Sequence, residues 1–194
     1  MKQLIVVNLT KKTIELKEFK DKWITIKKIS NISYGKNGYT LNKMEGDLKT
    51  PLGLFKLGPA FGFKNILIPY PYLKISKNSY WVNDFKSIFY NKWVEIGKIN
   101  SEYNYIISTN KIMWESAEHL IDYPCYNKGI IIEYNTSNPY HKVFKGNKKG
   151  SGIFIHIKDK NYTSGCIGVT EKDLDYILKW IKNDKNPYIL IKSR

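Results

Sequence analysis

Two side chains near the C-terminus have the types and spacing of a nucleophile and its base. Cys166 lies in the segment YTSGCIGV (residues 162–169), and His156 stands ten residues earlier in a β-rich run. A free thiol with a pKa of about 8.5 is mostly protonated at neutral pH, and a neighbouring imidazole can take its proton. We therefore expect a strand and a short loop, folded as a hairpin, to bring Cys166 and His156 together as a catalytic pair.

The residues directly before Cys166 fit the same chemistry. Gly165 leaves room beside a nucleophile and allows backbone angles that other residues avoid. The backbone N–H groups of Gly165 and Cys166 are candidate donors to the oxyanion of a tetrahedral intermediate, and Thr163 and Ser164 complete the motif. The alternative is an inert core cysteine beside a turn glycine, and the spacing alone leaves both interpretations open.

The remaining cysteine and histidines do not suggest a second site. Cys125 lies in IDYPCYNKG (residues 121–129), with no glycine before it and no strand histidine nearby, and is predicted to be structural. His119 is predicted to be a surface or packing residue, and His141 a solvated loop residue. No CxxC or Cys/His cluster has the spacing of a zinc site, so we expect neither a metal nor a cofactor.

The net charge of +15 at pH 7 favours an anionic partner, which would be nucleic acid, a membrane surface or a wall polymer. An AT-rich genome would produce the same abundance of lysine without selection for binding. Arg194 is the only arginine, and proteins that read DNA bases depend on arginine, so nucleic acid is not the expected partner.

The chain has no internal repeat, linker or long apolar run. With 194 residues, of which 42% are hydrophobic, it can bury a core, and we expect one domain over residues 1–194. No run is long enough to span a membrane, and the apolar start at residues 4–7 is too short for a signal peptide. The sequence says nothing of oligomeric state.

Most of the chain has the pattern of β-strands. Residues 4–19 form two β-rich runs around a polar turn, a predicted hairpin, and residues 22–29 form a third run. Residues 53–57 are predicted to be a short strand in a loop rich in Gly and Pro, and residues 128–135 a central strand. In residues 150–159 the alternation places Ile153 and its i+2 neighbours on one face, with Phe154 and His156 on the other.

Two helices are predicted. The first covers Met113 to Ile121, where helix-forming residues dominate and apolar side chains can share a face. The second begins after the N-cap Thr170 and has a buried stripe at helical spacing. The residues of that stripe are Leu174, Ile177, Leu178 and Ile181. A last strand is expected in residues 188–193, so the fold class is mainly β with two helices.

The segment IFIHIKDKNYTSGCIGV (residues 153–169) resembles the active-site segment of the L,D-transpeptidase (YkuD-type) family. In that family a strand histidine is followed by Ser or Thr, a variable residue, Gly and the catalytic Cys. Further segments resemble a divergent bacterial branch of the family, and the likeness spans the chain. They are LIVVNLTKKTIEL (4–16), GDLKTPLGLFKLGPAFG (46–62), YWVNDFKSIFYNKWV (80–94), SAEHL (116–120) and IIIEYN (130–135).

The resemblance implies a β-rich sandwich or barrel with a few helices, one of which follows the cysteine. It also implies that Cys166 attacks peptidoglycan stem peptides and forms a thioester with the L-centre of a diamino acid. Transfer of the acyl group to an amine gives a crosslink, whereas transfer to water gives carboxypeptidase action. A peptidoglycan substrate places the protein in the cell envelope, although no signal peptide is visible and a cytoplasmic location stays open.

This sequence departs from the usual family motif at three points. Ser164 stands where a second histidine is usual, so one proton carrier is missing. Gly168 stands where an arginine is usual, so a fixed positive charge that could hold a substrate carboxylate is missing. The loop between His156 and Cys166 is short.

Four further residues are candidates for substrate contact. Tyr134 and Asn135 end the predicted central strand, and Trp81 and Asp84 lie in the YWVND segment. The alternative is a polar turn after the strand for the first two, and a core position for Trp81. No carboxylate in the sequence is an obvious partner for His156, so a backbone carbonyl could orient its ring.

Two other functions remain open at this stage. One is a lytic or toxin-like peptidoglycan hydrolase on the same fold. The other is a basic β module that binds an anionic polymer and whose cysteine is incidental. A polymer affinity that falls steeply with salt and does not change in Cys166→Ala would favour the second.

Overall fold

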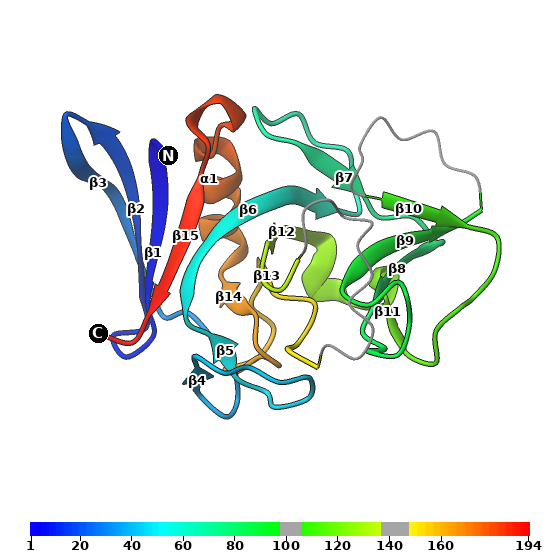
Figure 1. The fold of residues 1–194 in the computed structure, drawn as a ribbon. Coiled ribbons are helices and arrows are strands. Elements are labelled where there is room, and N and C mark those ends of the chain that lie inside the picture. Colours follow the sequence, from blue (N-terminus) through cyan, green and yellow to red (C-terminus); the bar gives the residue numbers. More distant parts are fainter. Residues whose placement is uncertain (98–105, 137–147) are drawn as a thin grey trace.

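The computed structural model describes residues 1–97, 106–136 and 148–194, and a curled sheet of nine strands dominates it (Figure 1). Eight strands follow one another in the order β14 (Ile167–Val169), β13 (Phe154–Ile157), β12 (Lys128–Ile132), β6 (Gly53–Gly62), β15 (Tyr188–Lys192), β1 (Gln3–Asn8), β2 (Thr13–Lys20) and β3 (Lys22–Ser30). The ninth, β7 (Tyr72–Lys74), pairs with β6. The prediction of a mainly β fold is confirmed.

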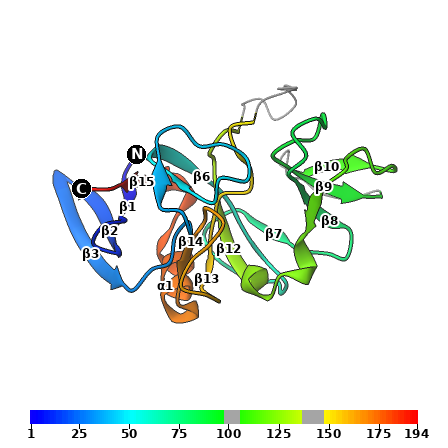
Figure 2. The same ribbon diagram turned by 90° about the horizontal axis from the view of Figure 1, so that it is seen from below.

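A smaller sheet lies at the other end of the molecule (Figures 1 and 2). Its order is β10 (Ile106–Thr109), β9 (Lys92–Ile96), β8 (Ser79–Val82) and β11 (Ala117–His119). The remaining short elements are β4 (Tyr39–Thr40), β5 (Thr50–Pro51) and the 3-10 turns η1 (Leu120–Asp122), η2 (Pro124–Asn127) and η3 (Asn183–Lys185).

The single α-helix of the described residues, α1 (Glu171–Trp180), packs against the large sheet. The Oγ1 of Thr170 accepts the N–H of Asp173, so the predicted N-cap is confirmed. All four residues of the predicted apolar stripe are buried in a core with the inward side chains of β1, β2, β12 and β13. The hairpin of β1 and β2 supplies its share through alternating residues such as Ile5 and Leu16, as predicted.

Strand β13 divides two cores, because its side chains alternate between the faces of the sheet. Ile153, Ile155 and Ile157 point to the α1 core, as predicted. Phe154 points the other way, into an aromatic core between the two sheets. The other large members of that core are Phe61, Trp81, Trp93 and Tyr126.

Strand β6 is longer than the predicted strand at residues 53–57. It runs to Gly62 because β12, β15 and β7 pair with it along its length. Pro59 has no backbone N–H to donate, but it breaks no regular hydrogen-bond ladder. The register between β6 and β12 already shifts beside this proline, between Ile130 and Ile132. Strand pairing therefore overrides the Gly and Pro signals of this segment.

The helix predicted for Met113 to Ile121 is wrong. Residues 117–119 form β11, which pairs with β8, and the next three residues form η1. Met113 and Ile121 are exposed, so the window has no continuous buried face. A segment of about nine residues is too short to be helical without such a face, and pairing with β8 satisfies its backbone instead.

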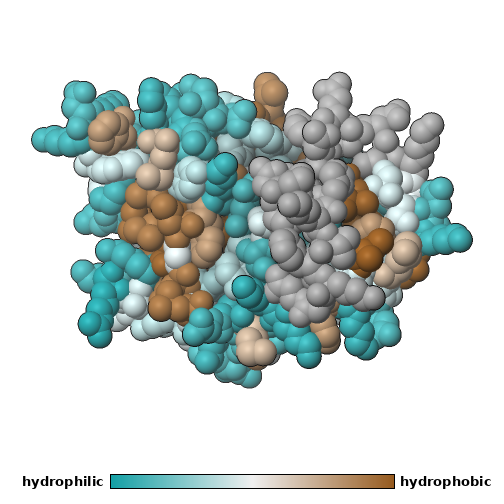
Figure 3. All heavy atoms as spheres, viewed as in Figure 1, coloured by the Kyte–Doolittle hydropathy of each residue, from teal (hydrophilic) through white to brown (hydrophobic). Residues whose placement is uncertain are grey.

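An apolar area lies on the outer side of the large sheet. Figure 3 shows it over β1 and β15, where Leu4, Val6 and Leu190 line a shallow groove. In the described part of the chain, no helix is both long enough and apolar enough to cross a membrane.

Candidate active site

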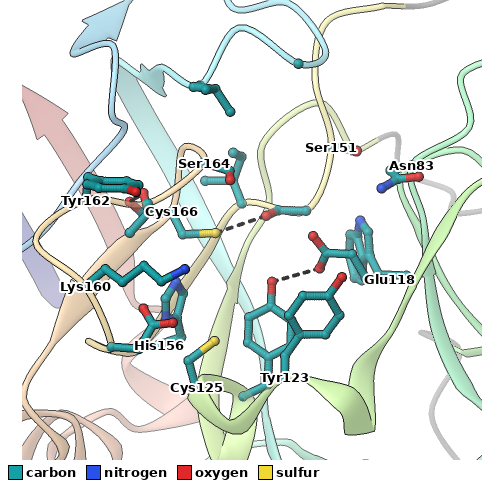
Figure 4. Close-up of a pocket in the computed structure, with 18 of the residues that line it drawn as sticks. Asn83, Glu118, Tyr123, Cys125, Ser151, His156, Lys160, Tyr162, Ser164 and Cys166 are labelled. Atoms are coloured by element: carbon teal, nitrogen blue, oxygen red, sulfur yellow. Dashed lines mark hydrogen bonds between the residues drawn. The ribbon is translucent and has the colours of Figure 1, made fainter.

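A cleft of about 410 Å³ lies between the two sheets and is lined by both Cys166 and His156. Strands β13 and β14 run parallel, with His156 opposite Gly168, so the chain after His156 does not fold back as the hairpin that was predicted to carry Cys166. The parallel register places Cys166 directly before β14, beside Phe154. Because Phe154 and His156 share one face of β13, the thiol and the imidazole enter the same cleft (Figure 4).

A network of hydrogen bonds fixes the loop that carries Cys166. The Oγ1 of Thr163 donates to the Cys166 carbonyl at 2.7 Å and accepts the Gly165 N–H at 3.1 Å. The Oγ1 of Thr50 donates to the Gly165 carbonyl at 2.9 Å and accepts the Gly35 N–H at 2.9 Å. The loop is therefore held both from within and from the β5 segment.

Gly165 is required at its position. Its φ is +145°, and a Cβ there would come within 2.9 Å of the Lys49 carbonyl oxygen. Its N–H already donates to Thr163, so it is not directed at a substrate oxygen. An oxyanion role for Gly165 would require this bond to open, whereas the N–H of Cys166 stays a predicted donor.

The thiol of Cys166 is buried and bonded on two sides. Its Sγ donates to the Gly152 carbonyl at 3.2 Å and accepts the Phe154 N–H at 3.3 Å. Burial raises the pKa of Cys166 to about 12, although the Phe154 N–H lowers it in part. In the resting structure Cys166 is therefore a neutral thiol.

The ring of His156 is oriented by a backbone carbonyl. Its Nδ1 lies 2.8 Å from the Ile157 carbonyl oxygen, which can only accept, so Nδ1 carries a hydrogen. Burial lowers the pKa of His156, and this keeps the imidazole neutral near pH 7. Nε2 is then an unprotonated base. A neutral thiol and a neutral imidazole in one cleft can transfer a proton as the sulfur attacks a carbonyl carbon.

A lysine stands near the nucleophile loop, in a cleft that has no arginine. Lys43 is buried and lines the cleft, and its Nζ lies 2.7 Å from Asp47 Oδ1. At Gly168, by contrast, a Cβ would lie 2.1 Å from the Ser33 Oγ. A side chain at position 168 would therefore clash with Ser33, and the positively charged residues that line this cleft, Lys43 and Lys160, come from other segments.

The opposite wall of the cleft belongs to the small sheet. Trp81, Asn83 and Glu118 line it (Figure 4 labels Asn83 and Glu118). The Tyr126 hydroxyl donates to Glu118 Oε2 at 2.7 Å. Burial raises the pKa of Glu118 to about 6, and the nearby charge of Glu45 adds to this effect.

The sequence profile of the YkuD family, the L,D-transpeptidase catalytic domain, matches residues 2–189. The chain belongs to this family. No curated protein matches it.

Solved structures support the same fold. Pgp2 of Campylobacter jejuni, a helical cell shape determining protein, matches with 17% identity and a TM-score of 0.53 over 100% of this chain and 48% of its own. Bd1075 of Bdellovibrio bacteriovorus matches with 16% identity and a TM-score of 0.50, again over 100% of this chain and 48% of its own. The chain therefore spans about half the length of these structures.

Among the four residues that the sequence suggested for substrate contact, the structure brings only Trp81 to the cleft. Asp84 is buried elsewhere and accepts the N–H groups of Lys86 and Glu115. Tyr134 and Asn135 tie neighbouring loops together through the Lys149 and Gly150 carbonyls. These three residues lie outside the lining of the cleft.

Several cleft residues escaped the sequence analysis. Cys125 was expected to lie apart from any strand histidine, yet it lines the same cleft as His156, because η2 carries it there. Lys43, Asn83 and Glu118 also come from segments far from the motif. The segments that contain Asn83 (residues 80–94) and Glu118 (residues 116–120) were noted for their resemblance to the family, but neither residue was singled out. His141 lies outside the described residues. Within those residues, no three metal-ligating side chains gather.

Proposed function

We propose that the chain is an L,D-transpeptidase domain that acts on peptidoglycan stem peptides through a thioester on Cys166. The observation that carries this proposal is the shared cleft of Cys166 and His156, in which a backbone carbonyl fixes the imidazole tautomer. Membership of the family supplies the substrate class.

In the first half-reaction, His156 Nε2 takes the thiol proton as Sγ attacks the carbonyl carbon of the diamino acid. A C–S bond forms, and the carbonyl electrons move to oxygen. When they return, the C–N bond to the terminal D-residue breaks, and His156 gives its proton to the leaving amine. The products are a thioester and a free D-amino acid.

In the second half-reaction an amine or a water molecule attacks the thioester. His156 takes a proton from the attacking group, and the thiolate that leaves is reprotonated. An amine of a second stem yields a crosslink, the outcome we favour. Water yields L,D-carboxypeptidase action, and the exposed, polar mouth of the cleft, with Lys160 and Ser164 at its rim, keeps that outcome as the second candidate.

The setting of the reaction follows from the substrate. Peptidoglycan lies outside the cytoplasmic membrane, so we place the protein in the cell envelope. The likeness to Pgp2, whose description is that of a cell shape determinant, is consistent with a role in the wall. The basic surface suits an anionic wall polymer.

Mass spectrometry of stem tetrapeptide muropeptides tests the proposal. Wild type should release the terminal D-residue, Cys166→Ala should not, and Cys125→Ala should retain most of the activity. The product mass then separates a crosslink from a shortened monomer. If wild type leaves the muropeptides intact, the proposed substrate is wrong.

A further inference from the structure

The small-sheet wall of the cleft contains polar groups whose hydrogen-bonding capacity is unused. Trp81 is 2% exposed, and its indole Nε1 has no hydrogen-bond partner. The Oδ1 of Asn83, two residues later, is also buried without a partner. A buried polar atom with no partner costs about 1–3 kcal/mol, so such atoms in a cleft beside a nucleophile point to a ligand.

Glu118 lies directly beside Trp81. The two residues are cross-strand partners in the antiparallel pair of β8 and β11, so their side chains share one face. Within the described residues, the carboxylate of Glu118 has a single hydrogen-bond partner, the Tyr126 hydroxyl, and no ion pair. The second carboxylate oxygen is left to bind something else.

The lysines of the cleft do not neutralise Glu118. Lys43 is paired with Asp47, and Lys160 lies on the Cys166 side in Figure 4. A negative charge also acts on Glu118, since the carboxylate of Glu45 raises the pKa of Glu118. Glu45 is held in place by the hydroxyl groups of Tyr90 and Ser151. This end of the cleft therefore favours a cation.

One of the unused groups, the Trp81 indole N–H, lies close to the residue that binds the reacting sulfur. Trp81 Nε1 would lie 3.4 Å from a Cβ built on Gly152, the residue whose carbonyl accepts the Cys166 thiol. In Figure 4, Glu118 and Asn83 lie on the opposite side of the cleft from Cys166. A substrate whose carbonyl carbon is at the sulfur would extend its neighbouring groups to this wall.

The chemistry of the three groups defines the ligand. A carboxylate and an amide oxygen accept hydrogen bonds from an ammonium group, whereas an indole N–H can only donate, to an oxygen. We infer that Trp81, Asn83 and Glu118 form a subsite for an α-amino-acid group. In that subsite Glu118 and Asn83 bind the ammonium, and the Trp81 N–H donates to the adjacent carboxylate. Given the proposed function, such a group ends the side chain of a diamino dicarboxylic acid in the stem.

A cycle that combines protein and substrate changes tests the subsite. The substrates are two tetrapeptides whose diamino acid side chain ends in CH(NH3+)COO−, one with this amine free and one with it acetylated. The enzymes are wild type, Glu118→Gln and, as a matched control, Glu115→Gln, whose side chain is exposed on the same segment. The measured quantity is kcat/KM for release of the terminal D-residue.

We expect acetylation to lower the wild-type kcat/KM by roughly 10- to 100-fold, the effect of one lost charge-assisted hydrogen bond. Glu118→Gln should lower it by a similar factor with the free amine and by no further factor with the acetylated peptide. Glu115→Gln should match wild type. If the two changes multiply independently, or if Glu118→Gln changes neither this kcat/KM nor the ratio of crosslinked to hydrolysed product, the subsite is wrong.

The ammonium could instead belong to the incoming stem. In that case Glu118→Gln leaves D-residue release unchanged and lowers the ratio of crosslinked to hydrolysed product. This result would support the ammonium subsite and assign it to the acceptor. A lowered release rate with an unchanged ratio assigns it to the donor.

A binding measurement separates this inference from the proposed function. Cys166→Ala protein labelled with 15N shows one indole N–H signal for each of the five tryptophans, and Trp81→Phe identifies the signal of Trp81. The free-amine tetrapeptide should shift this signal, and the acetylated peptide should shift it much less. Equal shifts would overturn the subsite even if wild type proves active. Inactivity of wild type together with a selective shift would overturn only the proposed reaction.

Discussion

The two walls of the cleft differ in how far their polar groups are satisfied. On the large-sheet wall, the Cys166 sulfur, the His156 Nδ1 and the Thr163 hydroxyl each have partners at 2.7–3.3 Å. On the small-sheet wall, Trp81 and Asn83 contain buried atoms that have no hydrogen-bond partner among the described residues, and Glu118 has no ion pair with any of them. A satisfied wall keeps the same geometry before and after binding. A wall with unused groups is complete only when a ligand is present.

This difference assigns separate tasks to the two sheets. The large sheet positions the reacting atoms, because pre-organised groups stabilise a transition state without reorganisation. In the proposed reaction, the small sheet binds and orients the rest of the substrate. Substitutions on the first wall should therefore act on the chemical step, and those on the second should act on affinity and specificity.

The largest effect is expected for His156→Gln. Glutamine can keep a hydrogen bond to the Ile157 carbonyl but cannot accept the thiol proton. The rate of acyl-enzyme formation should fall by roughly 10²- to 10⁴-fold, and alkylation of Cys166 by iodoacetamide should slow as well. Single-turnover kinetics and peptide mapping measure both. Unchanged alkylation of Cys166, with Cys125 as the internal reference, would show that His156 is not the base.

The pH profile of Glu118→Gln sharpens the comparison. Burial lowers the pKa of His156, so this base gains its proton at a lower pH than an ordinary histidine, whereas Glu118 loses its negative charge as the pH falls through about 6. For the free-amine peptide, the kcat/KM of wild type should therefore decline below about pH 6. The decline should flatten in Glu118→Gln, and kcat should change little. If kcat/KM declines in the same way in both proteins below about pH 6, the group that causes the decline belongs to the large-sheet wall.

A smaller effect is expected for Thr163→Val, which keeps the shape of the side chain. It removes the bonds to the Cys166 carbonyl and the Gly165 N–H, so the free energy of unfolding should fall by about 1–3 kcal/mol. Denaturant unfolding measures this change. Ser164→Ala, at the exposed neighbour, is the control and should stay within about 0.5 kcal/mol of wild type. Equal stability of both variants would mean that Thr163 does not hold the loop.

The smallest effect concerns His119 at the edge of the small sheet. Its Nε2 lies 2.8 Å from the Lys77 carbonyl and its Nδ1 2.9 Å from Asp122, so both nitrogens face acceptors. The backbone contact with Lys77, with the help of Asp122, raises the pKa of His119 despite partial burial. The stabilisation is therefore complete below the unfolded-state pKa of about 6.5 and is lost as the pH rises through the folded-state value.

Thermal unfolding of wild type and His119→Gln at several pH values measures how much protonated His119 stabilises the fold. Wild type should be more stable by up to about 1 kcal/mol at pH 6, and the difference should vanish in alkaline solution. A difference that grows with pH would contradict the assigned protonation state. The rate of the chemical step, which depends on the large-sheet wall, should be the same in both proteins at every pH.

The same comparison explains what the sequence could and could not predict. The residues from His156 to Thr170 are continuous in the sequence. Strand alternation, the glycine before Cys166 and the N-cap of α1 are local features, so they could be predicted from neighbouring residues. The small-sheet wall is assembled from β8 and β11, which are separated by more than thirty residues, and only their pairing brings Trp81 beside Glu118. The helix predicted over this segment failed for the same reason, since pairing with β8 overrode local propensity. Nor could the sequence show that β13 and β14 run parallel.

The most direct test of the central claim is the intact mass of the protein, quenched in acid during turnover of a stem tetrapeptide. Wild type and Cys125→Ala should both gain the mass of the tripeptide acyl group, and peptide mapping should locate it on Cys166. Cys166→Ala should gain nothing. An adduct on Cys125, or turnover by Cys166→Ala, would contradict the assignment of Cys166 as the nucleophile.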